Sequence, residues 1–196
     1  MDSVSDTTPR RFRDVEELID HLWSLDEIVS VEDDRLRELD HGLQCAALIA
    51  SSLPDDVEAQ VAGLVHDLAH PWDSAGQPRH ATMGALAVVD VLGERIAELI
   101  RSHVPAKRYL VATRPEYRSR LSPDSVMTLE AQGGTMTPDE VAAFEQHPDL
   151  DAAVTLRIAD DDAKVPGRVV PGLESWEDVI RLVASRHGSP DAGTRS

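Results

Sequence analysis

Histidines gather in one part of the sequence, and an aspartate directly follows one of them. Five of the eight histidines lie between residues 41 and 103, at His41, His66, His70, His80 and His103. His66 and Asp67 stand in the apolar segment GLVHDLAH, so we expect the pair to lie near the core, where a metal ion is an effective partner for polar side chains. Because Cys45 is the one cysteine, metal chemistry in this chain must use histidines and carboxylates.

An adjacent His-Asp pair on a helix suits a site that several helices build together. The two side chains project about 100° apart, so they do not easily chelate a single ion without help. If the two oxygens of Asp67 serve different ions, histidines from neighbouring helices can fill the remaining positions. A second carboxylate far along the chain, Asp160 in the run RIADDDAK, completes such a set.

The order His41, His66-Asp67 and Asp160 resembles the H…HD…D signature of the HD-domain superfamily, an all-helical fold of metal-dependent phosphohydrolases and related oxygenases. Further segments narrow the resemblance: LDHGLQCA around His41, HVPAKRYLVAT, LSPDSVMTLEAQGG, MTPDEVAAFE and LRIADDDAKVPG. Together they resemble the HD-domain mixed-valent di-iron oxygenases that cleave the carbon-phosphorus bond of 1-hydroxyalkylphosphonates. The resemblance covers roughly residues 30 to 175.

This resemblance implies two iron ions as cofactors, a mixed-valent Fe(II)/Fe(III) pair, with O2 as co-substrate. It places the metal ligands on His41, His66, Asp67, His80, His103 and Asp160. One iron takes His41, His66, Asp67 and Asp160, and the other takes His80 and His103, with Asp67 as the bridging, catalytic ligand. The products are a carboxylic acid and inorganic phosphate.

The resemblance also implies a pocket for a small organophosphonate substrate. Its residues are Lys107, Ser125, Thr128 and Arg157, with His70 beside the substrate. Cations, a guanidinium fork and hydroxyl donors are what a doubly charged phosphonate needs.

One departure from the family pattern concerns the segment before His41. The family carries a gating tyrosine ten residues before its first ligand histidine and a glutamate seven residues before it; here these positions hold Val31 and Asp34. Asp34 can still receive a cationic substrate amine, but valine cannot ligate iron. The gating tyrosine is therefore absent or comes from elsewhere, and the substrate differs from aminoethyl compounds.

Three other functions remain open. A hydrolytic HD phosphohydrolase acting on a phosphate ester uses the same metal site to activate water and consumes no oxygen. A variant zincin site would use the histidines of HDLAH, but that motif requires glutamate and leaves the remaining ligand residues unexplained. An acidic helical adaptor with incidental histidines is the non-enzymatic alternative.

Apolar periodicity predicts the helices that must position these residues. The predicted helices span residues 12–28, 34–53, 55–68, 80–92 and 94–103, followed by shorter ones at 114–121, 123–131, 138–146 and 150–162, with a loop at 71–79. His80 thus begins one helix and His103 ends another. The prediction is an all-α, HD-domain helical bundle with a dinuclear metal site in its core. It forms one domain over residues 11–187, with disordered ends at 1–10 and 188–196.

The charge and apolar content of the sequence limit the kinds of partner that we expect the protein to bind. The 196 residues carry 36 acidic and 19 basic side chains, a formal net charge of −17, so we expect no binding to nucleic acid or to an anionic membrane surface. Any anionic substrate needs a local basic pocket. No apolar stretch has the length of a signal peptide core or a bilayer span, so we expect a cytoplasmic protein, as a monomer or small homo-oligomer.

Overall fold

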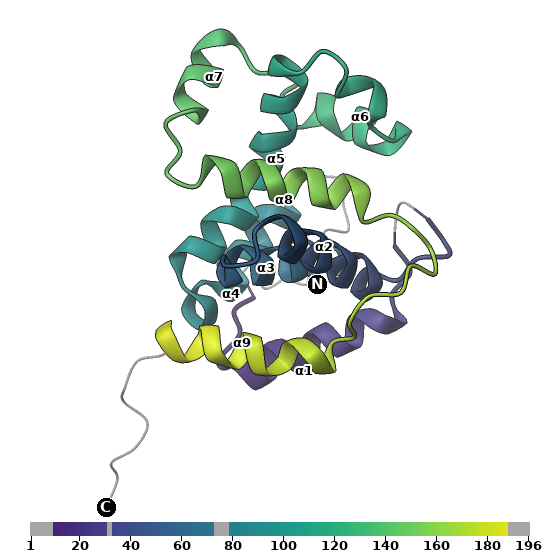
Figure 1. The fold of residues 1–196 in the computed structure, drawn as a ribbon, viewed down its shortest axis with the longest axis vertical. Helices are drawn as coiled ribbons and strands as arrows, with labels where there is room; N and C mark the ends of the chain where they lie inside the picture. Colours follow the sequence, from purple (N-terminus) through teal and green to yellow (C-terminus); the bar gives the residue numbers. More distant parts are fainter. Residues whose placement is uncertain (1–9, 31–32, 73–78, 188–196) are drawn as a thin grey trace, which may run out of the picture.

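The computed structural model describes residues 10–30, 33–72 and 79–187, and every regular element within them is helical (Figure 1). The α-helices are α1 (Val15–Ser24), α2 (Glu38–Ser52), α3 (Val57–Val65), α4 (His80–Leu92), α5 (Glu94–Thr113), α6 (Pro123–Ala131), α7 (Pro138–Phe144), α8 (Leu150–Asp162) and α9 (Glu174–His187). The 3-10 turns are η1 (Leu25–Glu27), η2 (His70–Trp72) and η3 (Arg118–Arg120). The predicted all-α class is confirmed. Among the helices of these ranges, none is long and apolar enough to cross a bilayer.

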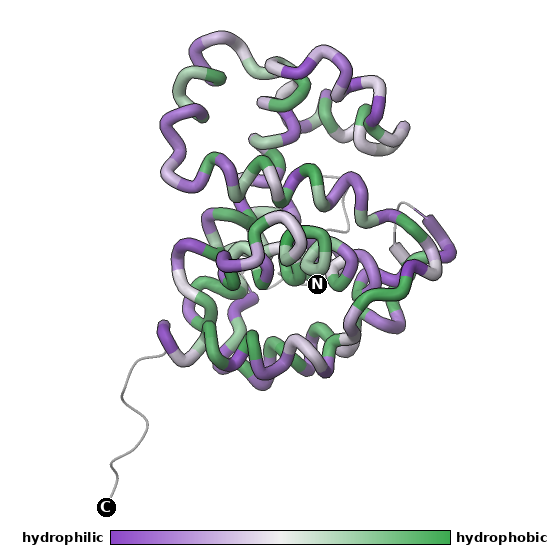
Figure 2. The backbone as a smooth tube through the Cα atoms, in the orientation of Figure 1, coloured by the Kyte–Doolittle hydropathy of each residue, from purple (hydrophilic) through white to green (hydrophobic). Residues whose placement is uncertain are grey.

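Five central helices form the body of the molecule. α5 packs against α3, α4 and α8, while α2 packs against α3 and α8. Figure 1 shows α1 and α9 on one side of this group, and α6 and α7 at the other end, beyond α8. Apolar and polar residues alternate along the helices in Figure 2, as expected where each helix buries one face.

Two glycines allow α2 and α3 to approach closely. A Cβ atom at Gly42 would lie 2.4 Å from the backbone oxygen of Leu64, and one at Gly63 would lie 2.4 Å from Cδ1 of Ile49. Because backbone atoms cannot move aside as a flexible side chain can, the contact at Gly42 requires glycine. This close packing brings His41, the residue before Gly42, next to the end of α3.

Helix boundaries near the site differ from the prediction in two places. α3 ends at Val65, and His66 and Asp67 lie in the turn that follows, so the angular spacing of a regular helix does not set their directions. α5 continues past His103 and through Pro105 to Thr113, where the prediction ended the helix at His103. Buried Ala106 and Leu110 pack the additional turns, which outweighs the backbone hydrogen bond lost at the proline.

Other predicted helices differ slightly in their bounds from those of the structure, and one helix of the structure was not predicted. α1 starts at Val15 instead of residue 12, because the Asp14 side chain caps it by accepting the Glu17 N–H. The structure begins α2 at residue 38 instead of 34, and only η3 forms within the predicted helix 114–121. α9 was not predicted, although its buried Trp176 and Ile180 have helical spacing. The ends predicted to be disordered lie outside the described residues, except for residue 10, as do positions 73–78 of the predicted loop.

Candidate metal centre

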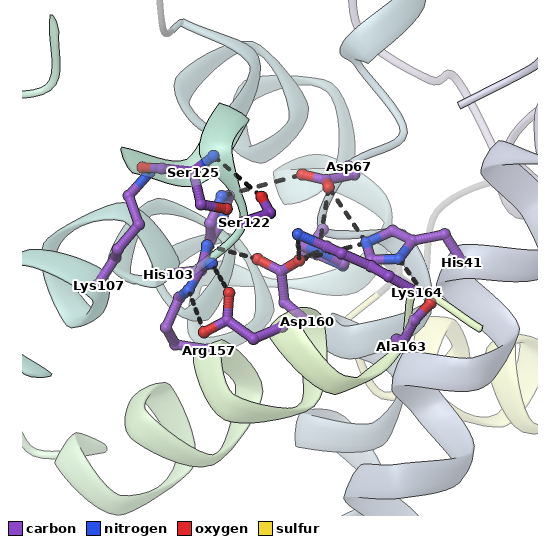
Figure 3. Close-up of polar contacts among 12 residues, drawn as sticks. His41, Asp67, His103, Lys107, Ser122, Ser125, Arg157, Asp160, Ala163 and Lys164 are labelled. Carbon is purple, nitrogen blue, oxygen red and sulfur yellow. Dashed lines mark hydrogen bonds and ion pairs between the residues drawn. The ribbon is translucent and has the colours of Figure 1, made fainter. Parts of the chain in front are cut away.

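Four predicted ligands from three parts of the chain meet in the core. His41 comes from α2, His66 and Asp67 from the turn after α3, and Asp160 from the last turn of α8. Figure 3 shows Asp67, His41 and Asp160 turned toward one another. The Nε2 atom of His41 lies 3.4 Å from Asp67 Oδ2 and 3.4 Å from Asp160 Oδ1. The Nε2 atom of His66 lies 3.2 Å and 3.8 Å from the same two oxygens. One ligand atom from each residue falls within 4.8 Å of all the others, which is the arrangement a metal ion requires.

A second group of histidines faces the other oxygen of Asp67. Asp67 Oδ1 lies 3.5 Å from Nε2 of His70, 3.6 Å from Nε2 of His80 and 3.9 Å from Nε2 of His103. The Nε2 atoms of His80 and His103 are 3.2 Å apart. The two oxygens of Asp67 therefore point to two different histidine groups, which is what a carboxylate bridging two ions must do.

Backbone carbonyl groups orient the ligand histidines. The Nδ1–H groups donate to carbonyl oxygens as follows: His41 to Ala163 at 3.1 Å, His66 to Gly63 at 2.8 Å, and His103 to Ile100 at 2.7 Å. These contacts turn each ring so that its Nε2 atom faces the carboxylates, where it can bind a metal ion once it carries no proton. His66 Nε2 and Asp67 Oδ1 are buried and make no hydrogen bond. A metal ion would satisfy both atoms, so the residues present fit a metal centre.

The pKa shifts of the histidines differ between the group that contains His41 and the group that contains His80 and His103. Burial opposes a charge on His41, but its hydrogen bonds to Asp160 and Asp67 raise its pKa to about 9. Burial lowers the pKa of His80 to about 4 and holds the pKa of His103 well below its ordinary value. His80 and His103 are therefore neutral at pH 7, the form in which an imidazole can bind a metal ion.

Buried Lys107 and Arg157 lie beside the centre, near Ser125 and Thr128, the other two residues of the predicted phosphonate site. Lys107 of α5 is 2% exposed and donates from Nζ to Thr128 Oγ1 at 2.9 Å and to the backbone oxygen of Ser125 at 3.5 Å, both on α6. Figure 3 shows Lys107 and Ser125 on one side of Asp160 and His41 on the other. Burial and then the nearby charge of Arg157 lower the pKa of Lys107 to about 8. Arg157 is paired with the carboxylates of Asp160 and Asp161, whereas Lys107 donates to hydroxyl and carbonyl oxygens.

The segment before His41 contributes a residue that the sequence analysis missed. Glu38, in the first turn of α2, is buried, and its Oε2 accepts a hydrogen bond from His70 Nδ1 at 3.2 Å. Its Oε1 is buried and makes no hydrogen bond. Asp34, the predicted receiver of a substrate amine, is exposed in the turn before α2, and Val31 lies outside the described residues. The position of Glu38 one turn before His41 was the available signal.

Comparisons with known proteins agree with this geometry. The family model described as HD domain matches residues 40–161. The chain is 38% identical over 160 residues to hydroxymethylphosphonate dioxygenase of Gimesia maris, covering 77% of this chain and 79% of the relative. It is 33% identical over 156 residues to the glycine-betaine-forming [1-hydroxy-2-(trimethylamino)ethyl]phosphonate dioxygenase of Leisingera caerulea, covering 76% of this chain and 79% of the relative. Uncharacterized protein L432 of Acanthamoeba polyphaga mimivirus is 30% identical over 155 residues, covering 73% of this chain and 69% of the relative.

Proposed function

Because the chain belongs to the HD-domain family of phosphonate oxygenases, we propose that it cleaves the carbon-phosphorus bond of a 1-hydroxyalkylphosphonate with O2. One hydroxyphosphonate dianion and one O2 balance against one carboxylate, one hydrogen phosphate dianion and one proton. The observation that carries the proposal is the placement of the two Asp67 oxygens, each facing its own histidine group, beside the buried cations Lys107 and Arg157.

We propose that the metals are two iron ions forming a mixed-valent pair. His41, His66, Asp67 and Asp160 would hold one ion, and His80, His103 and the second oxygen of Asp67 would hold the other. When bound, the irons supply the activation of O2 and the oxidation of C1. Histidine and carboxylate ligands suit non-haem iron, and the unsatisfied atoms His66 Nε2 and Asp67 Oδ1 support a metal at this place.

The residues of the pocket bind and orient the substrate. The ammonium group of Lys107 and the guanidinium group of Arg157 neutralise the phosphonate, while the hydroxyl groups of Ser125 and Thr128 hold its oxygens. Glu38 accepts the Nδ1–H of His70, which leaves His70 Nε2 to accept the proton of the C1 hydroxyl group. Lys107 and Arg157 would supply the local positive charge that a chain with a net charge of −17 needs to bind an anion.

The relatives differ in the group beyond C1, so the substrate must be found by assay. The test is a screen of O2 consumption and phosphate release over 1-hydroxyalkylphosphonates, beginning with hydroxymethylphosphonate and cationic hydroxyethyl compounds. We expect equal amounts of O2 consumed and phosphate released, about two irons per chain and a mixed-valent electron resonance signal. Phosphate release from a phosphate ester without O2 would instead establish the hydrolase. A cytoplasmic location and a monomer or small homo-oligomer complete the proposal.

A further inference from the structure

The carboxylate of Asp160 is held by different partners at its two oxygens. Oδ1 faces the Nε2 atoms of His41 and His66, and Lys164 Nζ lies 3.6 Å from it. Oδ2 accepts a hydrogen bond from Arg157 Nη1 at 2.7 Å, as the dashed lines in Figure 3 show. A carboxylate whose second oxygen is occupied in this way offers one oxygen to a metal ion.

Arg157 is in turn held by two residues to which the sequence analysis gave no function. Its Nε donates to the Tyr117 hydroxyl oxygen at 3.1 Å and to Asp161 Oδ2 at 3.3 Å, and its Nη2 donates to Asp161 Oδ1. The Tyr117 hydroxyl group donates to Asp161 Oδ2, which closes a ring of hydrogen bonds. Arg157 and Tyr117 are 4% and 5% exposed, so water competes little for these contacts.

Tyr117 makes this arrangement rigid. Arg157, Asp160 and Asp161 share one face of α8 at spacings of three and four residues, where side chains can exchange partners by changing rotamer. Tyr117 belongs to the segment between α5 and η3, forty residues away in the sequence, so its hydroxyl group ties the guanidinium group to a second part of the fold. The contacts use three of the five guanidinium N–H groups, leaving two for a substrate oxygen.

We propose that Tyr117 and Asp161 are positioning residues that clamp Arg157, and that the clamped Arg157 holds Asp160 so that it presents only Oδ1 to the metal. The inference rests on the proposed function in one respect, that Asp160 is a metal ligand. It adds to the centre a tyrosine that acts through Arg157.

The test measures metal binding, which needs no turnover. Co(II) is titrated into metal-free protein in competition with a chelator, for the wild type and for Tyr117→Phe, Arg157→Lys and the double variant. Tyr109→Phe is the matched control, because the Tyr109 hydroxyl group bonds to Glu145 away from this cluster. We expect Tyr117→Phe to weaken the binding of one Co(II) ion about fivefold, the weight of one hydrogen bond, and Tyr109→Phe to leave it unchanged.

The double variant separates positioning from a general effect on folding. If Tyr117 acts through Arg157, Tyr117→Phe adds no further loss in the Arg157→Lys background. Full additivity, or a Tyr117→Phe affinity within twofold of wild type, overturns the inference. Should Tyr117→Phe fail to fold, Asp161→Asn takes its place with the same two criteria.

The outcomes for the clamp and for the proposed function can be told apart. A wild-type chain that binds no Co(II) overturns the metal assignment and the clamp together. A chain that binds Co(II) with the expected coupling but oxidises no hydroxyphosphonate leaves the clamp in place and overturns the proposed function alone.

Discussion

Replacing Lys107 with methionine should stabilise the fold while weakening substrate binding. Lys107 is 2% exposed, and its pKa falls from 10.5 to about 8 through burial and the charge of Arg157. At 1.36 kcal/mol per pKa unit, the protonated amine costs the folded state about 3 kcal/mol at pH 7. Losing its hydrogen bond to Thr128 offsets about 1 kcal/mol of this. The free energy of unfolding of Lys107→Met should therefore rise by about 2 kcal/mol.

The same substitution removes a charged donor from the phosphonate. A hydrogen bond to a charged group contributes about 1.5–3 kcal/mol, so kcat/KM should fall by roughly tenfold to a hundredfold. Iron content should not change, because Lys107 bonds to Thr128 and Ser125 and not to a metal ligand. Arg108→Met is the control, since it removes one positive charge at the next position, where the side chain pairs with Glu140.

The pH dependence gives a second measurement with a defined sign. Between pH 8 and pH 10.5 the unfolded state binds the Lys107 proton and the folded state does not, so wild-type stability gains from this group as pH rises through that window. Over the same pH range wild-type kcat/KM changes in the opposite sense and falls above about pH 8, as Lys107 loses its charge. Lys107→Met should show neither change.

Urea unfolding at pH 7 and pH 9.5 measures the free energy of unfolding and its pH dependence. O2-uptake kinetics from pH 6.5 to 9 measure kcat/KM over the range in which Lys107 loses its charge. A Lys107→Met protein that is less stable than wild type at pH 7, or that keeps the wild-type fall in kcat/KM above pH 8, would refute the reasoning.

Three further predictions concern the metal centre and its packing. Gly42→Ala should cost about 1–3 kcal/mol in urea unfolding, because its Cβ would lie 2.4 Å from the Leu64 carbonyl oxygen; wild-type stability would disprove the close contact. His80→Ala should lower iron content from about two ions to about one per chain and abolish O2 uptake; unchanged O2 uptake would refute a second iron held by His80. Titrating metal into the metal-free chain at pH 7 should release a proton, because the pKa of His41 is raised to about 9, and calorimetry in buffers of different ionisation enthalpy measures it. A heat that does not depend on the buffer would contradict this.

The sequence by itself was sufficient for the helical class and for the kinds of ligand available. Apolar spacing records which face of a helix is buried, so α4, α6 and α8 could be placed with their observed bounds. A single cysteine and clustered histidines limited metal chemistry to nitrogen and oxygen donors. The same spacing would also have identified α9, whose buried Trp176, Ile180 and Val183 recur at intervals of four and three residues.

Only the tertiary structure decided which distant groups meet. Nothing in a periodic pattern indicates that the two oxygens of Asp67 face different histidine groups, because that depends on how the helices cross. Burial likewise separates Glu38, which bonds to His70 at the centre, from exposed Asp34 one turn earlier. The contact of Tyr117 with Arg157 joins residues forty positions apart. Local sequence records local periodicity, whereas the directions of side chains at a shared site depend on the packing of the whole bundle.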